Sequence, residues 1–358
     1  MKSALIRADG SQNLGLGHVM RCLAFAQGLR KTGVESLFVT RNYEQKIAEI
    51  IHRHKFDIEP MPTKHGFKED LRMTSELATQ HTATLIITDL CNSNTLPNLA
   101  GYSEYLQGLK DTGMFLITID DLNKIAFPSD IVVNPNYGAE KMDYPPQACG
   151  TRFLLGPAYF LFRLEFIEVA GVNRETRKDA QNILITMGGS DLLDLTVKVA
   201  RALKSLPHLQ RALNVQIVLG PGYPDSIRQE VSEIFNNFPG NLQLLQVSDN
   251  MAGLMLWSDL AITGGGLTKY ETAVTGTPSI IISQVPHQEK LAKEFEKEGT
   301  ALNLGLGTRV SEEKIAGAVV NLLENGTLRA EMGRMGRKLV DGRGIERIIS
   351  EIPQEVLS

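Results

Sequence analysis

Residues 7–21 read RADGSQNLGLGHVMR, and the interpretation of the chain starts from this stretch. It follows a short apolar run at 4–6 and precedes apolar residues at helical spacing, which predicts a strand, a glycine-bearing loop and a helix that ends at Gly33. Backbone N–H groups at such a helix start are unpaired and the helix dipole is positive there, so the loop suits an anion. The same field disfavours an imidazolium, so we expect His18 to be neutral near pH 7 and able to act as a base.

Two familiar glycine-loop patterns do not fit this stretch. A GxGxxG dinucleotide motif would need glycine where Met20 stands, and an acidic residue where Thr40 and Arg41 follow the second strand. The Gly-Lys-Ser/Thr sequence of a nucleoside-triphosphate loop is absent. A simpler interpretation of His18, a helix-start histidine satisfied by local hydrogen bonds, is equally compatible with its spacing.

Bulk properties describe an ordinary globular chain. Its 358 residues suggest about two domains, and its net charge of −4 without a basic run argues against nucleic acid as a partner. No apolar segment resembles a signal peptide or a membrane span. Cys22, Cys91 and Cys149 show neither metal-binding nor disulfide spacing. We therefore expect a cytoplasmic, monomeric enzyme that acts on a small molecule and needs no metal or cofactor.

The first half alternates strand-like and helix-like segments, which predicts an α/β fold with a parallel sheet covered by helices on both faces. Strands are expected at 4–7, 36–40, 56–61, 84–88, 115–119 and 131–133, and helices at 18–31, 44–53, 69–80 and 103–111. Ligands of such sheets bind at the carboxyl ends of the strands. Polar residues that directly follow strands are therefore candidates for ligand binding.

Several polar residues stand at these strand ends. Asp89, Asp120–Asp121 and Asn134 each follow a predicted strand and could face one crevice, although helix caps and turns use the same residue types. Asp9 and Arg21 lie close enough to His18 in sequence to orient it or a ligand, or to act only as capping or pairing residues. The choice between these roles stays open at this point.

A Pro- and Gly-rich segment at 143–156 marks the expected domain boundary. The first domain is assigned to residues 1–158, the linker to 159–179 and the second domain to 180–358. We expect the last helix to pack back on the first domain.

The second half repeats the pattern. Strands are expected at 183–186, 215–219, 242–246, 260–263 and 278–282, and helices at 250–258, from 287, and at 311–323, 327–340 and 345–352. Gly188-Gly189-Ser190 would open a helix running to about 206, where glycine lets the backbone approach a ligand and the helix start offers N–H groups. A tight turn with Ser190 or Asp191 as N-cap explains the same residues.

Three glycines at 264–266 follow a strand and precede a helix, which makes a second candidate phosphate site. Glu271 has two interpretations. With Thr268 it matches a capping box, or its carboxylate accepts hydrogen bonds from the two hydroxyls of a ribose. His287 and Gln288 open the next helix and would either face a nucleotide or cap that helix.

At this point the residues resemble a known family. The second half is similar to the nucleotide-binding half of the glycosyltransferases that add N-acetylglucosamine in peptidoglycan synthesis, through 250–251, 258–259, 264–271, 276–278 and 287–288. The whole order of motifs resembles the UDP-2,4-diacetamido-2,4,6-trideoxy-β-L-altropyranose hydrolases of pseudaminic acid synthesis and their spore-coat polysaccharide relatives. The motifs that carry this second resemblance are 7–11, 15–23, 119–121, 155–159, 187–191 and 341–344.

The resemblance implies a GT-B fold, in which two doubly wound Rossmann-like domains face a central cleft. It implies that UDP binds the second domain, with residues 265–268 at the diphosphate, Glu271 at the ribose and the 247–251 region at the uracil, and that His18 is the catalytic histidine. The residues predicted to contact substrate are Asp9, Gly15, Gly17, Arg21, Asp89, Gly188, Gly189, Ser190, Met251, Gly265, Gly266, Leu267, Thr268, Glu271 and Gln288.

The expected reaction is hydrolysis of a UDP-linked diacetamido sugar. UDP is a good leaving group, so a base that deprotonates a water on the opposite face of the anomeric carbon is sufficient, and C–O cleavage inverts that carbon. Two alternatives remain: a UDP-sugar-dependent glycosyltransferase, in which an acceptor replaces water, and a non-catalytic nucleotide-sugar sensor.

Overall fold

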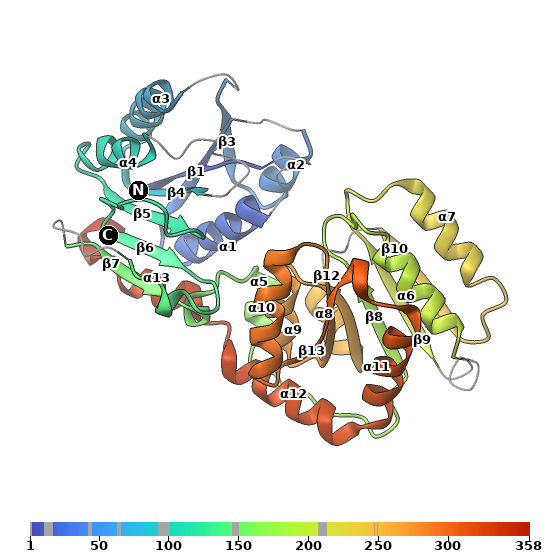
Figure 1. The fold of residues 1–358 in the computed structure, drawn as a ribbon. Coiled ribbons are helices and arrows are strands. Elements are labelled where there is room, and N and C mark those ends of the chain that lie inside the picture. The colour runs from blue at the N-terminus through green and yellow to red at the C-terminus, as the bar shows by residue number, and fades with distance from the viewer. Residues whose placement is uncertain are drawn as a thin grey trace. The chain divides into compact units, whose positions relative to one another are not determined.

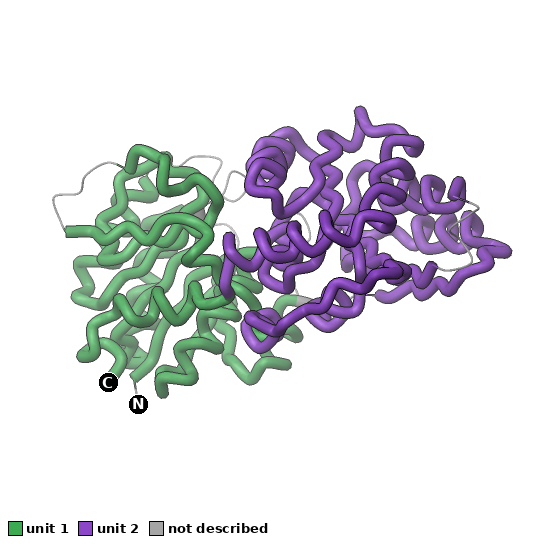
Figure 2. Tube along the Cα trace, turned by 90° about the horizontal axis from the view of Figure 1, so that it is seen from below, with its two compact units in different colours: residues 1–164, 342–358 green, residues 165–341 purple. Residues whose placement is uncertain are grey.

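The computed structural model describes most of the chain, with short gaps. The described residues are 2–10, 17–41, 45–62, 66–91, 101–144, 150–206, 213–246, 248 and 250–358, so the predicted contact residue Gly15 lies outside them. The chain forms two compact units, Met1–Leu164 with Gly342–Ser358, and Glu165–Asp341 (Figure 2). The division falls inside the segment expected to be a linker, and the last 17 residues belong to the first unit.

A parallel sheet forms the centre of the first unit (Figure 1). Its seven described strands are β1 (Ser3–Ala8), β2 (Glu35–Thr40), β3 (Asp57–Pro60), β4 (Ala83–Cys91), β5 (Phe115–Asp120), β6 (Ile131–Asn134) and β7 (Arg152–Leu155). Its helices are α1 (Gly17–Lys31), α2 (Gln45–Arg53), α3 (Phe67–Gln80), α4 (Tyr102–Lys110), α13 (Gly344–Ser350) and α14 (Gln354–Leu357), with short 3-10 turns at Ala139–Lys141 and Pro157–Tyr159. The six predicted strands and four predicted helices are confirmed. The edge strand β7 was not predicted.

The strand order β3-β2-β1-β4-β5-β6-β7 places the reversal of the chain between β1 and β4. Successive strands are added outward from β1 to β3, and the chain then crosses back to start β4 on the other side of β1. Ala8 at the end of β1 pairs with Asp89 on β4. Loops diverge to opposite faces of a sheet at such a point, which leaves a crevice where ligands of doubly wound sheets bind.

The second unit has the same plan. Its described strands are β8 (Asn182–Thr186), β9 (Asn214–Leu219), β10 (Asn241–Gln246), β11 (Leu260–Gly264), β12 (Ser279–Ser283) and β13 (Ala301–Leu306), in the order β10-β9-β8-β11-β12-β13. Its helices are α5 (Leu164–Val169, which begins at the division), α6 (Leu195–Lys204), α7 (Asp225–Ile234), α8 (Met251–Trp257), α9 (Thr268–Thr275), α10 (Pro286–Lys297), α11 (Glu312–Glu324) and α12 (Gly326–Leu339), with a 3-10 turn at Gly307–Arg309. Two α/β units with doubly wound parallel sheets are therefore confirmed.

Helix α6 begins later than the sequence predicts. It starts at Leu195, six residues beyond Gly189. The Asp191 carboxylate accepts hydrogen bonds from the N–H groups of Leu195 and Thr196, at 2.8 and 2.7 Å. The N–H groups of Leu195 and Thr196 are thus already satisfied by Asp191, in agreement with the alternative in which Asp191 caps this helix.

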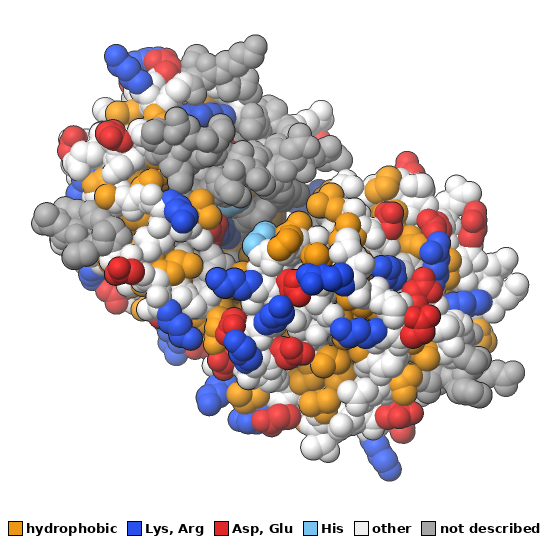
Figure 3. Space-filling model, in the orientation of Figure 1, with side chains coloured by type: hydrophobic (Ala, Val, Ile, Leu, Met, Phe, Trp, Pro, Cys, Tyr) orange, Lys and Arg blue, Asp and Glu red, His pale blue; other side chains and the backbone are white. Residues whose placement is uncertain are grey.

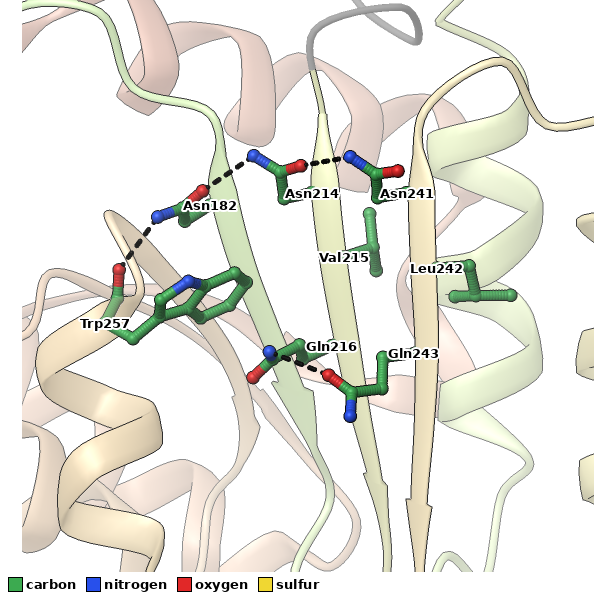
Figure 4. A pocket seen from close by; sticks show the side chains of 8 residues that line it. All are labelled: Asn182, Asn214, Val215, Gln216, Asn241, Leu242, Gln243 and Trp257. Atoms are coloured by element: carbon green, nitrogen blue, oxygen red, sulfur yellow. Dashed lines mark hydrogen bonds between the residues drawn. The ribbon is translucent and has the colours of Figure 1, made fainter.

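A shallow pocket of ≈ 650 Å³ lies at the opposite, amino edge of the second sheet (Figure 4). Its polar wall is a row of amides in which Asn241 donates to Asn214, Asn214 to Asn182, and Asn182 to the carbonyl of Trp257. These asparagines begin their strands, so the pocket is remote from the carboxyl edge where the predicted ligand residues lie. Over the face of the second unit drawn in Figure 3, acidic and basic side chains of the described residues are interspersed.

A buried ionic cluster holds the carboxyl ends of β1 and β2 together. Arg7, fully buried on β1, donates to Asp9 at 2.5 and 3.0 Å and to Asp70 of α3 at 2.9 Å. Arg41 Nε and the Tyr105 hydroxyl also donate to Asp70, at 2.6 and 2.9 Å. Burial raises the pKa of Asp70, but Arg7, Arg41 and the Tyr105 hydroxyl together outweigh it and hold that pKa below its ordinary value.

Removing the charge of Asp70 tests whether this cluster stabilises the first unit. We expect Asp70→Asn to lower the free energy of unfolding by about 3 kcal/mol, because it leaves Arg7 and Arg41 short of a buried carboxylate. Chemical denaturation measures the loss. Glu76→Gln on the same helix is the matched control, since Glu76 pairs with Arg72 at the surface and should change little. Equal stability of the two variants would contradict the role given to Asp70.

Candidate functional site

His18 lies in the first turn of α1 and pairs with a carboxylate from the centre of the sheet. Its Nδ1 is 2.7 Å from Oδ1 of Asp89 on β4. The Asp89 side chain is fully buried, and that of His18 is 13% exposed. The partner is 71 residues away in sequence, so the fold brings this carboxylate to the ring.

Arg21, one turn further along α1, decides which ring nitrogen of His18 carries hydrogen. Arg21 Nη2 has two hydrogens, and both have carboxylate acceptors: Asp89 Oδ1 at 2.6 Å and Asp121 Oδ2 at 2.9 Å. Although Nη2 is also 3.0 Å from His18 Nδ1, it has no further hydrogen to donate there. Nδ1 therefore donates to Asp89, and in the neutral ring Nε2 is the atom that can accept a proton.

Asp89 is held ionised at the centre of this arrangement. Burial by itself would raise its pKa, but the charge of Arg21, followed by His18, lowers that pKa far below its ordinary value. Arg21 Nε adds a bond of 2.5 Å to Asp89 Oδ2. An aspartate fixed in this way orients the imidazole and stabilises the imidazolium that forms when the ring takes a proton.

The strand-end residues divide into two groups. Asp89 and Asp121 come together around Arg21, as the crevice hypothesis expects, and Asn136 supports Asp121 at 2.8 Å. Asp120 and Asn134 instead bind the Tyr144 hydroxyl. The predicted substrate contact by Asp89 stays untested, but its oxygens are already occupied, and the structure gives it an orienting position that the sequence argument did not assign.

Two other predicted contact residues are placed as follows. Asp9 belongs to the buried cluster with Arg7, and its Oδ1 also accepts from the backbone N–H of Arg41 at 2.8 Å. Gly17 is the first residue of α1. Both lie at the carboxyl edge of the sheet, and substrate contact by either remains a prediction.

In the second unit, the loops after β8 and β9 pack tightly together at the carboxyl edge. The N–H of Gly222 donates to the carbonyl of Gly189 at 2.8 Å, and the backbone of Gly220 lies against the carbonyls of Gly188 and Gly189 with no room for a side chain. Gly188 has φ +93°, a conformation that favours glycine. The two glycines predicted to approach a ligand are thus fixed by a neighbouring loop.

Gln284, which directly follows β12, holds other residues of the loop after β8. Its Nε2 donates to the carbonyls of Met187 and Ser190, both at 3.0 Å, and its Oε1 accepts from the N–H of Leu192 at 2.8 Å. Gln284 was not among the residues predicted from the sequence. A polar side chain directly after a buried strand, at the same edge as two glycine loops, was the signal that could have found it.

The loop between β11 and α9 presents backbone donors. Within the described residues, the N–H groups of Gly266 and Leu267 donate no hydrogen bond. Leu267 is in helical conformation (φ −66°, ψ −23°) and Thr268 begins the helix without a side-chain cap, so the predicted Thr268–Glu271 capping box is wrong. An N-cap residue needs an extended backbone, which neither residue has. Glu271 lies in the first turn, where the ribose interpretation remains open.

Gln288 and Met251 complete the predicted positions. Gln288 of α10 lies against Gly265, and its Oε1 accepts from the N–H of Gln284 at 3.0 Å. Met251 is the first residue of α8 and is mostly buried, after the cap residue Asn250. The loops after β8, β11 and β12, on three adjacent strands, therefore bring together Gly188, Gly189, Ser190, Gly265, Gly266, Leu267, Thr268 and Gln288.

No helix among the described residues combines the length and the apolar character needed to cross a bilayer. No group of three or more His, Cys, Asp or Glu side chains among them is arranged to hold a metal ion.

Comparison with known proteins identifies the fold that the two units form together. Residues 182–346 match the family model described as Glycosyltransferase family 28 C-terminal domain. The chain is 29% identical over 347 residues to the spore coat polysaccharide biosynthesis protein SpsG of Bacillus subtilis, covering 96% of this chain and 95% of that protein. The solved structure of Acinetobacter baumannii MurG matches with a TM-score of 0.68 and 16% identity, over 99% of this chain and 100% of that one. The chain has the GT-B fold.

A more distant relative carries a chemically specific name. The UDP-2,4-diacetamido-2,4,6-trideoxy-beta-L-altropyranose hydrolase of Campylobacter jejuni is 26% identical over 299 residues, covering 82% of this chain and 96% of that enzyme. Together with the family 28 domain, this relates the chain to enzymes of the GT-B class that use UDP-sugars.

The tautomer of His18 tests the geometry of the first unit directly. We expect ¹⁵N NMR of histidine-labelled protein to show that the neutral form of His18 carries its hydrogen on Nδ1, because the Arg21 hydrogens are used by Asp89 and Asp121. Loss of one resonance set in His18→Asn assigns the signal. A ring with hydrogen on Nε2 would contradict the arrangement.

Proposed function

We propose that the chain hydrolyses a UDP-linked 2,4-diacetamido-2,4,6-trideoxy sugar, the β-L-altropyranose, to UDP and the free sugar. The observation that carries this proposal is the His18–Asp89 pair, in which a buried, ionised carboxylate orients the imidazole through Nδ1, so that Nε2 is the ring atom that would act as a base. The name of the Campylobacter relative supports the substrate, and the motif order across the chain agrees with it.

The proposed step is a single displacement at the anomeric carbon. A water oxygen forms a bond to that carbon while the bond to the diphosphate oxygen breaks, and the electron pair leaves with UDP. The water proton passes to His18 Nε2, and Asp89 stabilises the imidazolium. Attack from the face opposite the leaving group inverts the anomeric configuration.

UDP departs as an anion, so the leaving oxygen needs charge stabilisation more than a proton. In this proposal the backbone N–H groups of Gly266 and Leu267 and the start of α9 supply that stabilisation. Glu271, in the first turn of α9, would bind the ribose hydroxyls, and Met251 with the start of α8 would lie at the uracil.

A second candidate is transfer of the sugar to an acceptor. The match of residues 182–346 to a domain named for glycosyltransferases favours this candidate. A nucleotide-binding domain could serve either reaction, so this match does not decide between transfer and hydrolysis. Release of UDP and free sugar in the absence of any acceptor separates the two: a hydrolase releases both, whereas a transferase without its acceptor releases little.

Substitution of His18 tests the proposed base. We expect His18→Asn to lower kcat by about 100-fold or more, the scale of general-base contributions, while the affinity for UDP stays unchanged. The Asn amide can still donate to Asp89, so the fold around it is preserved. UDP release from the diacetamido sugar nucleotide measures kcat, and titration with UDP measures binding.

His52→Asn is the control, because His52 is exposed on α2 and belongs to no part of the proposed site. Its kcat should equal that of the unmodified chain. Near-normal turnover in His18→Asn would exclude His18 as the base.

A further inference from the structure

Lys269 is a buried cation directly under the glycine loop of the second unit. It is the second residue of α9 and only 3% exposed. No acidic side chain pairs with it within the described ranges, and its Nζ lies 4.9 Å from the ring of Tyr270 and 5.6 Å from that of Phe295. Unpaired buried lysines are costly, so this one calls for a physical explanation.

The ammonium group is bonded to the loop itself. Nζ donates to the carbonyl of Gly265 at 3.0 Å and to the carbonyl of Gly266 at 2.8 Å. In a trans peptide the C=O and the following N–H point in opposite directions. When these two carbonyls turn inward to Lys269, the N–H groups of Gly266 and Leu267 must turn outward, and these are the N–H groups that donate no bond within the described chain.

A second observation points to a ligand at the same loop. Ser283, at the end of β12, is 0% exposed, and its Oγ has no hydrogen-bond partner among the described residues. A Cβ added to Gly265 would lie 2.8 Å from that Oγ. A buried hydroxyl without a partner is uncommon and calls for an explanation, and this one lies directly against the glycine loop.

We propose that Lys269 is a positioning residue for the diphosphate of a nucleotide: it holds the Gly265 and Gly266 carbonyls inward, so that the N–H groups of Gly266 and Leu267 face the phosphate oxygens. This inference rests on the proposed function, in which the loop binds UDP. Successive backbone N–H groups that converge in this way form an anion-binding concavity.

The charge of Lys269 adds to this role. Burial lowers its pKa to about 7. His287 of α10 is the titratable neighbour, and its pKa is also lowered, by burial and then by the positive charge of Lys269. With a pKa of about 7, Lys269 is only partly charged near neutral pH in the empty protein, and a bound diphosphate would favour its ammonium form.

The test compares ligands with and without phosphate on the full chain. We expect Lys269→Met to weaken UDP binding by about tenfold or more, the scale of lost hydrogen bonds to charged groups, and to leave the affinity for uridine unchanged. Lys269→Gln keeps two N–H donors for the carbonyls, so it should retain more UDP affinity than Lys269→Met. NMR titration measures each affinity.

Lys297→Met on α10 is the matched control, because the Lys297 side chain is 68% exposed and pairs with Glu294 at the surface. Unchanged UDP affinity in Lys269→Met would overturn the inference. So would an equal loss of uridine and UDP affinity, or an equal loss in the Gln and Met variants. If the unmodified chain itself bound no UDP, the proposed function would fail, and that result is distinguishable from failure of Lys269 alone.

Discussion

The candidate chemistry depends on one buried carboxylate. Asp89 extends from the central strand β4 and receives hydrogen bonds from Arg21 and His18, both on α1. Burial favours the neutral form of a carboxyl group, so one that stays ionised without solvent needs a charged partner. Here Arg21, which also binds Asp121, is that partner. Because Arg21 uses its hydrogens on the two carboxylates, the imidazole donates from Nδ1. Arg21 thereby determines which ring nitrogen of His18 carries the hydrogen, although Arg21 takes no part in the proposed proton transfer.

The two units position their candidate site residues in the same way, at the point where the strand order of the sheet reverses. Each sheet reverses its strand order once, between β1 and β4 in the first unit and between β8 and β11 in the second. His18 and Asp89 lie at the first reversal, and the glycine loops at 188–189 and 264–266 lie at the second. The topology of a doubly wound sheet makes these the places where backbone and side chains are least covered. In the second unit, Gln284 and Lys269 then fix loops that glycine alone would leave adaptable.

Much of the fold follows from periodicity, since most strands and helices of both units begin and end within about two residues of their expected positions. The failures are local. Strand β7 lies at a sheet edge, and its short apolar run 153–155 stands in a Pro- and Gly-rich segment that was assigned to a domain boundary. The edge strand β13 and helix α7 were not predicted either. Helix α6 starts late because Asp191 caps it from a distance. The capping box failed because Leu267 is already helical. His18 was found from its helix-start position, but its pairing with Asp89 spans 71 residues and no local pattern contains it.

The central claim is that His18 activates a water for attack at the anomeric carbon, and the fate of the water oxygen tests it most directly. Turnover of the UDP-linked diacetamido sugar in H₂¹⁸O, without an acceptor, should place the label in the free sugar and none in UDP, as mass spectrometry of both products will show. Label in UDP would mean attack at phosphorus with P–O cleavage, and it would contradict the account given for His18 and Asp89.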